Sequence, residues 1–258
     1  IQGLGPEIQQ LCDDLIDQFP SGPFDLLEAY ASKVPVIIIA RLLGVPARDA
    51  DLLLSWSNNM VKMYQAGRTI ADEIDAASAS AAFATYIQDV IAAKRETPND
   101  DLISALIKAQ DDGSGLSNAE VVSTCILLLN AGHEATVHTM GNTIKTLLET
   151  ATPFSPQCIE EAMRFDPPLH MFTRYVYEDV DFDGFSAKKG QQIALLLGAT
   201  NRDPDRWDAP DTFDPHRTPQ QHLAFGAGGH FCLGAPLARL ELSIGLQTLF
   251  DRKSDLSL

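Results

Sequence analysis

A ten-residue run near the C-terminal end constrains this chain more than any other feature. Residues 225–234 read FGAGGHFCLG, so a glycine-rich loop presents one cysteine, Cys232. A helix-like run, 235–250, follows at once, and it places the cysteine near a helix N-terminus. Free backbone N–H groups and the helix dipole stabilise a thiolate at such a position. A thiolate held in this way suits a soft metal, above all haem iron with the sulfur as axial ligand.

The pattern F-G-x-G-x-H-x-C-x-G resembles the haem-binding loop of the cytochrome P450 family. The resemblance implies that Cys232 ligates the iron of haem b and that Phe225 packs beside the haem near the sulfur. It also implies that Gly226 and Gly234 form part of the cofactor-binding loop.

Two cationic positions extend the resemblance. His230, two residues before the cysteine, lies where the family binds a haem propionate, and Arg174 matches the other propionate-binding position. Cationic donors suit both places because they pair with carboxylates. The alternative for Arg174 is a surface arginine at a strand edge.

Glu161 and Arg164 form an E-x-x-R motif that occurs once in the chain. Three residues apart on a helix, the two side chains share a face and can pair. Most such pairs are solvated surface pairs, but this one precedes Phe-Asp-Pro-Pro and resembles the K-helix motif of the P450 family. The resemblance implies a buried Glu161–Arg164–Arg217 network with a structural role in haem assembly, and the loss of one partner from such a network is costly.

A third motif lies in the longest apolar run, where residues 131–136 read AGHEAT. It resembles the I-helix signature A-G-x-[DE]-[TS], which implies that Gly132 makes room for a diatomic ligand and that Glu134 delivers protons. Ala135 stands where the family usually has an alcohol, and Thr136 follows one residue late. Neighbours on a helix are about 100° apart, so Thr136 cannot take that place without a local distortion. We therefore expect an ordered water or a substrate hydroxyl to complete the path of the protons. The candidate catalytic residues are Gly132, Glu134 and Thr136.

Two other interpretations of this run are open. Glu134 and Thr136 can serve as a helix-interior ion-pair and back-bonding pair without a role in catalysis. The letters HEATVH also resemble the zinc motif H-E-x-x-H, but His133 and His138 are five residues apart. A zinc pair needs histidines four residues apart on one face, so a zinc hydrolase is disfavoured.

Composition narrows the classes of partner. The net charge is −16, from 35 acidic and 19 basic residues, which argues against nucleic acid and anionic membrane surfaces. No apolar run reaches the roughly 18 residues that a bilayer span needs. The first residues lack the basic start and apolar core of a signal peptide. The four cysteines are scattered, as suits a reducing cytosol, so we expect a cytoplasmic protein.

Hydrophobic periodicity predicts helices in the first two thirds of the chain. The longest, 121–149, is apolar nearly all round and should cross the interior, and Ser117 with Glu120 resembles a capping box at its start. Pro35 predicts a kink or split in the helix expected at 24–43. The other expected helices cover 6–19, 49–65, 69–94 and 97–110.

After Pro167-Pro168 the pattern changes to short strands, expected at 172–177, 180–182 and 192–196. A polar connection, 201–222, contains four prolines, which predict irregular backbone. The fold class is therefore mainly α with small β sheets, and the resemblance implies the cytochrome P450 fold.

The resemblance covers nearly the whole chain, which is short for the family. We expect one incomplete P450 domain, 1–258, that lacks the N-terminal section and the final strands. The resemblance implies that His170 and Met171 lie in the loop after the K helix and contact substrate there. It implies a substrate contact for Ala131 as well.

The activity implied is haem-thiolate monooxygenation, in which one atom of O₂ enters a small lipophilic substrate and the other leaves as water. Because the chain has no flavin or iron–sulfur motif, a ferredoxin or flavodoxin-type donor with its reductase should supply the electrons. A peroxide-driven peroxygenase, which Ala135 makes more plausible, and a non-enzymatic haem sensor are the alternatives.

Overall fold

The computed structural model describes residues 1–258 except residues 66, 114 and 219–220. Contacts divide the chain into two compact units. The helical unit consists of Gln10–Val137, and the C-terminal unit consists of Ile1–Gln9 with His138–Leu258. The expectation of one incomplete P450 domain stays a prediction.

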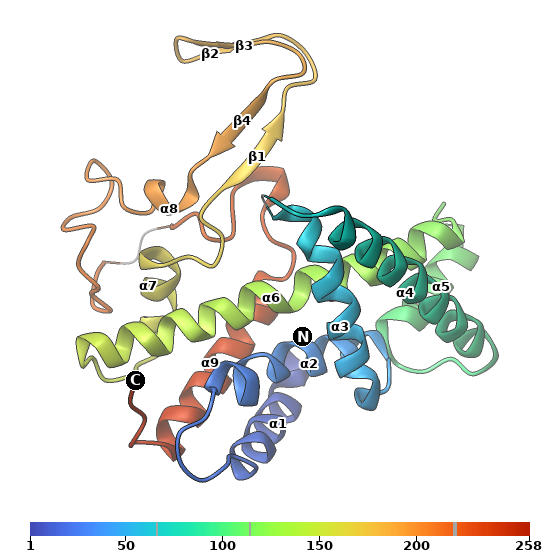
Figure 1. The fold of residues 1–258 in the computed structure, drawn as a ribbon, viewed down its shortest axis with the longest axis horizontal. Coiled ribbons are helices and arrows are strands. Elements are labelled where there is room, and N and C mark those ends of the chain that lie inside the picture. Colours follow the sequence, from blue (N-terminus) through green and yellow to red (C-terminus); the bar gives the residue numbers. More distant parts are fainter. Residues whose placement is uncertain (66, 114, 219–220) are drawn as a thin grey trace. The chain divides into compact units, whose positions relative to one another are not determined.

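Among its described residues, the helical unit contains helices joined by turns and loops, and no strand (Figure 1). Helix α6 contributes its first 20 residues to this unit and continues into the C-terminal unit. Helix α1 runs the other way: its residues 5–9 belong to the C-terminal unit and the rest to the helical unit. The elements are α1 (Gly5–Asp17), the π-helix η2 (Leu27–Ala31), α2 (Lys33–Leu43), η3 (Ala47–Asp49), α3 (Ala50–Val61), η4 (Lys62–Tyr64), α4 (Ile70–Glu96), α5 (Leu102–Asp111) and α6 (Asn118–Thr150).

The core of the helical unit forms where α2, α3 and α4 bury their apolar residues. Helix α2 is apolar along most of its length, and Val34, Ile38 and Leu43 are fully buried. On α4, Phe83 is buried and its ring lies 5.4 Å from that of Trp56 on α3. Burial of these large side chains supplies most of the favourable free energy of the unit, at about 1.5–3 kcal/mol each.

Local signals in the sequence set the ends of these helices. The predicted capping box before α6 is present: Ser117 Oγ accepts from the Glu120 amide at 3.2 Å, and the Ser117 amide donates to Glu120 Oε2 at 2.8 Å. The predicted split near Pro35 is also present, at Ser32 between η2 and α2. Pro35 then lies in the first turn of α2, where its missing N–H costs nothing.

The C-terminal unit combines the end of α6 with short helices and two small sheets. The helices are η1 (Gln2–Leu4), α7 (Gln157–Phe165), α8 (Leu197–Thr200), η5 (Gly228–His230) and α9 (Ala235–Arg252). Strand β1 (Phe172–Tyr175) pairs antiparallel with β4 (Gln192–Leu195), and β2 (Val180–Phe182) pairs with β3 (Phe185–Ala187). In the first pair Arg174 stands opposite Ile193, and in the second Phe182 stands opposite Phe185.

The β2–β3 hairpin turns at the predicted Asp183-Gly184. Both residues have positive φ, 46° and 77°, which is the conformation that a two-residue hairpin turn favours and that glycine adopts without strain. The predicted strand at 172–177 ends two residues earlier than expected, and β3 was not anticipated.

Irregular backbone connects α8 to the cysteine loop, as the prolines predict. The described residues of 201–222 contain no helix or strand, and two residues of the predicted connection, 219–220, lie outside the described part. The mainly α fold class with small sheets is confirmed. No helix of the described residues has the length and hydropathy required to span a bilayer.

Candidate haem-binding site

The cysteine loop is closed by its own backbone. The Cys232 amide donates to the Phe225 carbonyl at 2.9 Å, and the Phe231 amide donates to the Gly228 carbonyl at 3.1 Å. Gly226 and Gly228 have φ of 69° and 68°, a left-handed backbone that other residues adopt only with strain. The loop therefore depends on its glycines for shape.

Cys232 is the one exposed cysteine, whereas Cys12, Cys125 and Cys158 are buried. It precedes α9 by three residues, and the Ala235 amide donates to its carbonyl at 3.3 Å. A Cβ at Gly234 would lie 3.8 Å from the Cys232 sulfur, an ordinary van der Waals contact, so Gly234 is next to the sulfur in space. An accessible thiol beside a helix N-terminus is the donor that a thiolate-ligated haem requires, so the loop fits that cofactor.

Both predicted propionate ligands are exposed side chains of the C-terminal unit. His230 ends η5 within the cysteine loop, and Arg174 lies on β1. The Arg174 guanidinium donates to the Thr173 carbonyl at 3.0 Å and lies over the Phe172 ring at 5.9 Å. Among the described residues no hydrogen bond joins Arg174 to the loop, so the structure does not bring these two cations into contact.

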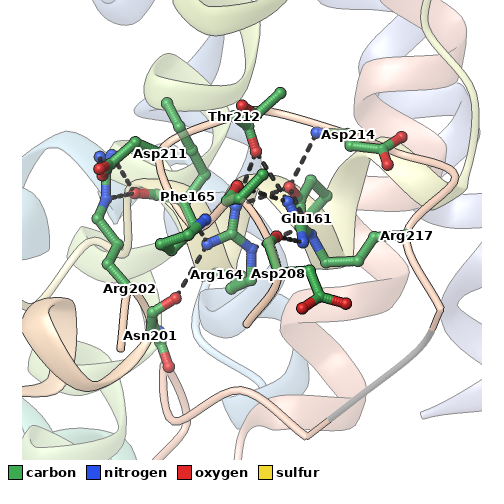
Figure 2. A network of polar contacts seen from close by, with 12 residues as sticks. Glu161, Arg164, Phe165, Asn201, Arg202, Asp208, Asp211, Thr212, Asp214 and Arg217 are labelled. Carbon is green, nitrogen blue, oxygen red and sulfur yellow. Dashed lines mark hydrogen bonds and ion pairs between the residues drawn. The ribbon is translucent and has the colours of Figure 1, made fainter. Parts of the chain in front are cut away.

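Glu161 and Arg164 form a buried ion pair on α7 (Figure 2). The Arg164 Nε and Nη2 atoms each donate to a different Glu161 carboxylate oxygen at 2.8 Å, a bidentate arrangement. Glu161 also accepts from the Asp214 amide at 2.9 Å and from Arg217 Nε at 3.4 Å. Arg164 is 1% exposed and Glu161 6% exposed, which excludes a solvated surface pair.

The two arginines also bind the proline-rich connection. Arg164 Nη1 donates to the Asn201 and Pro210 carbonyls, both at 2.9 Å, while Nη2 donates to the Thr212 carbonyl at 3.1 Å. Arg217 Nη2 donates to the same Thr212 carbonyl at 3.0 Å. These bonds satisfy carbonyls that have no sheet or helix partner, and they fix the backbone that leads into the cysteine loop (Figure 2).

A second charged cluster next to this network was not anticipated. Glu160 accepts from Arg239 Nε at 2.6 Å and Nη2 at 3.0 Å, and from His222 Nε2 at 3.0 Å. Burial alone would raise the pKa of Glu160, but the hydrogen bonds from His222 and Arg239 outweigh it and lower the pKa to about 2. The Arg239 guanidinium lies 4.6 Å from the centre of the Phe225 ring. The sequence offered no signal for this cluster, because Glu160 and Arg239 are 79 residues apart.

In the helical unit, α6 presents part of its motif on an exposed face. Leu127, Ala131 and Glu134 are exposed and follow helical spacing. The missing side chain of Gly132 points to α2, where a Cβ would lie 3.2 Å from Ile39 Cγ1. A larger residue at this position would therefore have to displace the Ile39 side chain by a few tenths of an ångström.

Thr136 is placed differently from the expectation for a catalytic alcohol. It is 5% exposed, and two positions along a helix turn it about 200° away from Glu134. Helix α6, all of whose residues are described, is a continuous α-helix from Asn118 to Thr150. On such a helix the Thr136 hydroxyl and the Glu134 carboxyl lie on different faces, and a catalytic role of Thr136 stays a prediction.

The predicted substrate-contacting residues divide between the two units. His170 and Met171 are exposed immediately before β1, and the His170 ring lies 3.3 Å from Asp166 Oδ1. The His170 carbonyl accepts from the Gly198 amide at 3.1 Å, which fixes the backbone at this point. Ala131 lies on the exposed face of α6.

Comparison with known proteins agrees with this geometry. The family model for cytochrome P450 matches residues 150–252. Cytochrome P450 107B1 of Saccharopolyspora erythraea is 38% identical over 267 residues, which cover 99% of this chain and 64% of the relative. The structure of the bacillaene polyketide synthase cytochrome P450 PksS of Bacillus subtilis 168 has a TM-score of 0.91 and 34% identity, covering 100% of this chain and 68% of that one.

A second solved structure is P450BioI in complex with hexadec-9Z-enoic acid ligated to acyl carrier protein. It has a TM-score of 0.93 and 33% identity, covering 100% of this chain and 69% of that one. The chain spans 64–65% of the length of the first curated relatives that it matches. The sequence and structural likeness together show that this chain belongs to the cytochrome P450 family.

Proposed function

We propose that this chain carries the haem-thiolate site of a monooxygenase. In that reaction one atom of O₂ enters a small lipophilic substrate, and the other leaves as water with two protons and two electrons. The observation that carries the proposal is the exposed Cys232 in a glycine-shaped loop at the N-terminus of α9. Membership of the P450 family also supports a monooxygenase activity, since thiolate-ligated haem favours O–O cleavage.

Each loop residue has a role that follows from its place. The Cys232 sulfur ligates the iron, and the positive end of the α9 dipole stabilises the thiolate form of that sulfur. Gly226 gives the loop its left-handed turn, and Phe225 holds the Cys232 amide through its carbonyl. Arg174 and His230 pair with the haem carboxylates. The Glu161–Arg164–Arg217 network holds the connection that leads into the loop.

Glu134 delivers protons in this proposal. Its exposure on one face of α6 supports that role, because a proton shuttle must reach both solvent and substrate. Ala135 supplies no hydroxyl beside it, and Thr136 is buried on another side. An ordered water or a hydroxyl of the substrate therefore completes the path.

A small lipophilic molecule is the substrate class we propose, with His170, Met171 and Ala131 among its contacts. The names of similar proteins support the class: one relative is a vitamin D(3) 25-hydroxylase, and P450BioI forms a complex with an acyl carrier protein to which hexadec-9Z-enoic acid is ligated. A separate ferredoxin or flavodoxin-type protein with its reductase supplies the electrons, and the site works in the cytoplasm.

The test is the absorption spectrum of the reduced, CO-bound protein after haem loading. We expect the red-shifted Soret band of thiolate ligation in the wild type and in Cys158→Ser, whose side chain is buried elsewhere. The band should vanish in Cys232→Ser. A thiolate band that survives in Cys232→Ser would overturn the assignment of the ligand, and a wild-type band typical of imidazole ligation would overturn the function.

A second candidate, oxygen transfer driven by peroxide, is favoured by one observation. Ala135 removes the hydroxyl that usually assists proton delivery to bound oxygen, and peroxide brings its own protons and electrons. Turnover with peroxide and without reductase would support this candidate. If Ala135→Thr raises turnover with the redox partner and lowers turnover with peroxide, the monooxygenase is the native reaction.

A further inference from the structure

The cluster of Glu160, His222 and Arg239 touches the cysteine loop from the side of α7 and α9. Glu160 binds the Arg239 guanidinium through both of its oxygens. His222, which is buried, donates from Nε2 to Glu160 and accepts the Ala224 amide at Nδ1, at 3.2 Å. Both ring nitrogens therefore have partners, and the carboxylate is held between a fixed imidazole and a guanidinium.

From this position Arg239 reaches the loop through an aromatic ring. Its guanidinium lies 4.6 Å from the centre of the Phe225 ring, within the range of a cation–π contact. The carbonyl of the same Phe225 accepts the Cys232 amide at 2.9 Å. The hydrogen bonds of Glu160 and the charge of the Cys232 thiolate both raise the pKa of Arg239, so the guanidinium and the sulfur interact electrostatically.

We propose that Arg239 is a positioning residue for the cysteine loop: Glu160 holds its guanidinium against Phe225, and from there its charge acts on the Cys232 sulfur and raises the reduction potential of the haem which that sulfur ligates. The inference rests on the proposed function. A nearby positive charge favours the reduced iron because that state carries one more negative charge. Glu160 has the opposite effect, since its carboxylate partly cancels the guanidinium.

Removing the charge of Arg239 and removing that of Glu160 should shift the reduction potential of the haem in opposite directions. Arg239→Gln removes the positive charge, so the potential should fall and the ratio of reduced to oxidised haem at a fixed applied potential should drop several-fold. Glu160→Gln removes the negative charge but keeps an acceptor for Arg239, so that ratio should rise. Arg239→Lys keeps the charge and should stay close to the wild type. Because the side chain of Arg239 is 40% exposed, all shifts should shrink as salt is added.

The experiment is a spectroelectrochemical titration of the haem-loaded protein, with the CO spectrum recorded for each variant first. Shifts in the same direction for Arg239→Gln and Glu160→Gln, or an Arg239→Lys shift as large as that of Arg239→Gln, overturn the inference, because structural damage does not follow the sign of a charge. If Arg239→Gln does not retain haem, the potentials of Glu160→Gln and Arg239→Lys still test the inference: the first should rise and the second should stay close to that of the wild type. Thiolate bands with unchanged potentials overturn this inference alone, whereas a wild type without the thiolate band overturns the proposed function as well.

Discussion

Two neighbouring helices of the C-terminal unit bury a glutamate in opposite ways. On α7, Glu161 is buried against two arginines and a backbone amide. On α9, which packs against α7, Glu241 is fully buried, and neither carboxylate oxygen has a hydrogen-bond partner among the described residues. Burial raises the pKa of Glu241 to about 8. The same residue type is therefore part of a charged network in one helix and a neutral acid at pH 7 in the other.

The difference shows that burial does not determine the charge of a carboxyl group by itself. Desolvation disfavours the ionised form at both sites, and only the partners differ. On α7 the partners come from a connection that would otherwise leave carbonyls unbonded, so the ion pair also organises backbone. On α9 the residues beside Glu241 are apolar, and the proton is retained because no cation compensates its loss.

Removal of one partner from the α7 network should have the largest effect. Glu161→Ala leaves Arg164 buried without its counter-ion, and we expect a loss of about 3–5 kcal/mol in the free energy of unfolding. Chemical denaturation measures it. Glu149→Ala is the matched control, because the Glu149–Lys145 pair on α6 is exposed and 3.9 Å apart. The control should lose less than about 1 kcal/mol. Equal losses in the two variants would show that the buried pair contributes no more than a surface one.

Glu241→Gln should give the next largest effect, and the effect should depend on pH. The folded state holds the Glu241 proton up to about pH 8, whereas the unfolded chain releases it near the ordinary value of 4.5. The folded state thus binds more protons in this window, so the stability of the wild type should fall as pH rises through it. The variant lacks this fall in stability, and its free energy of unfolding relative to the wild type should rise by about 4 kcal/mol between pH 4 and pH 8.

Denaturation curves at pH 4, 6 and 8 test the Glu241 prediction. Glu178→Gln, which changes an exposed glutamate of the same unit, should run parallel to the wild type at all three values. A difference between Glu241→Gln and the wild type that stays constant from pH 4 to pH 8 would mean that Glu241 does not carry its proton at neutral pH.

Local sequence signals predicted the charged pair on α7 but not the buried neutral acid on α9. The Glu161–Arg164 pair follows from a spacing of three on a helix, and the capping box at Ser117 likewise depends on neighbours in sequence. Arg217 was reached through the family resemblance, because 56 residues separate it from Glu161. Periodicity gave most of the longer helices and the strands β1, β2 and β4 to within a few residues, whereas it did not indicate α8 or β3.

Contacts between distant residues explain what the sequence did not reveal. Glu241 stands in a run that reads ARLEL, and nothing in those letters distinguishes a buried carboxyl from a solvated one. The motif on α6 was recognised, but the side of the helix on which Thr136 lies depends on how α6 packs. The Glu160–Arg239 contact depends on the fold in the same way.

Glu160 provides the smallest effect and the most direct contrast with Glu241. Its partners lower its pKa to about 2, so its contribution to stability is present above the ordinary value of 4.5 and is lost as pH falls toward 2. The side chain is 50% exposed, and solvent screening should keep the contribution below about 1 kcal/mol. Glu160→Gln should therefore flatten the acid limb of the stability curve between about pH 4.5 and 2, whereas Glu241→Gln flattens the limb between pH 4.5 and 8.

Added salt should abolish the Glu160 effect and leave the Glu241 effect, because salt screens an exposed ion pair and not a buried neutral acid. If both effects respond to salt alike, the distinction between a paired and a solitary carboxyl fails.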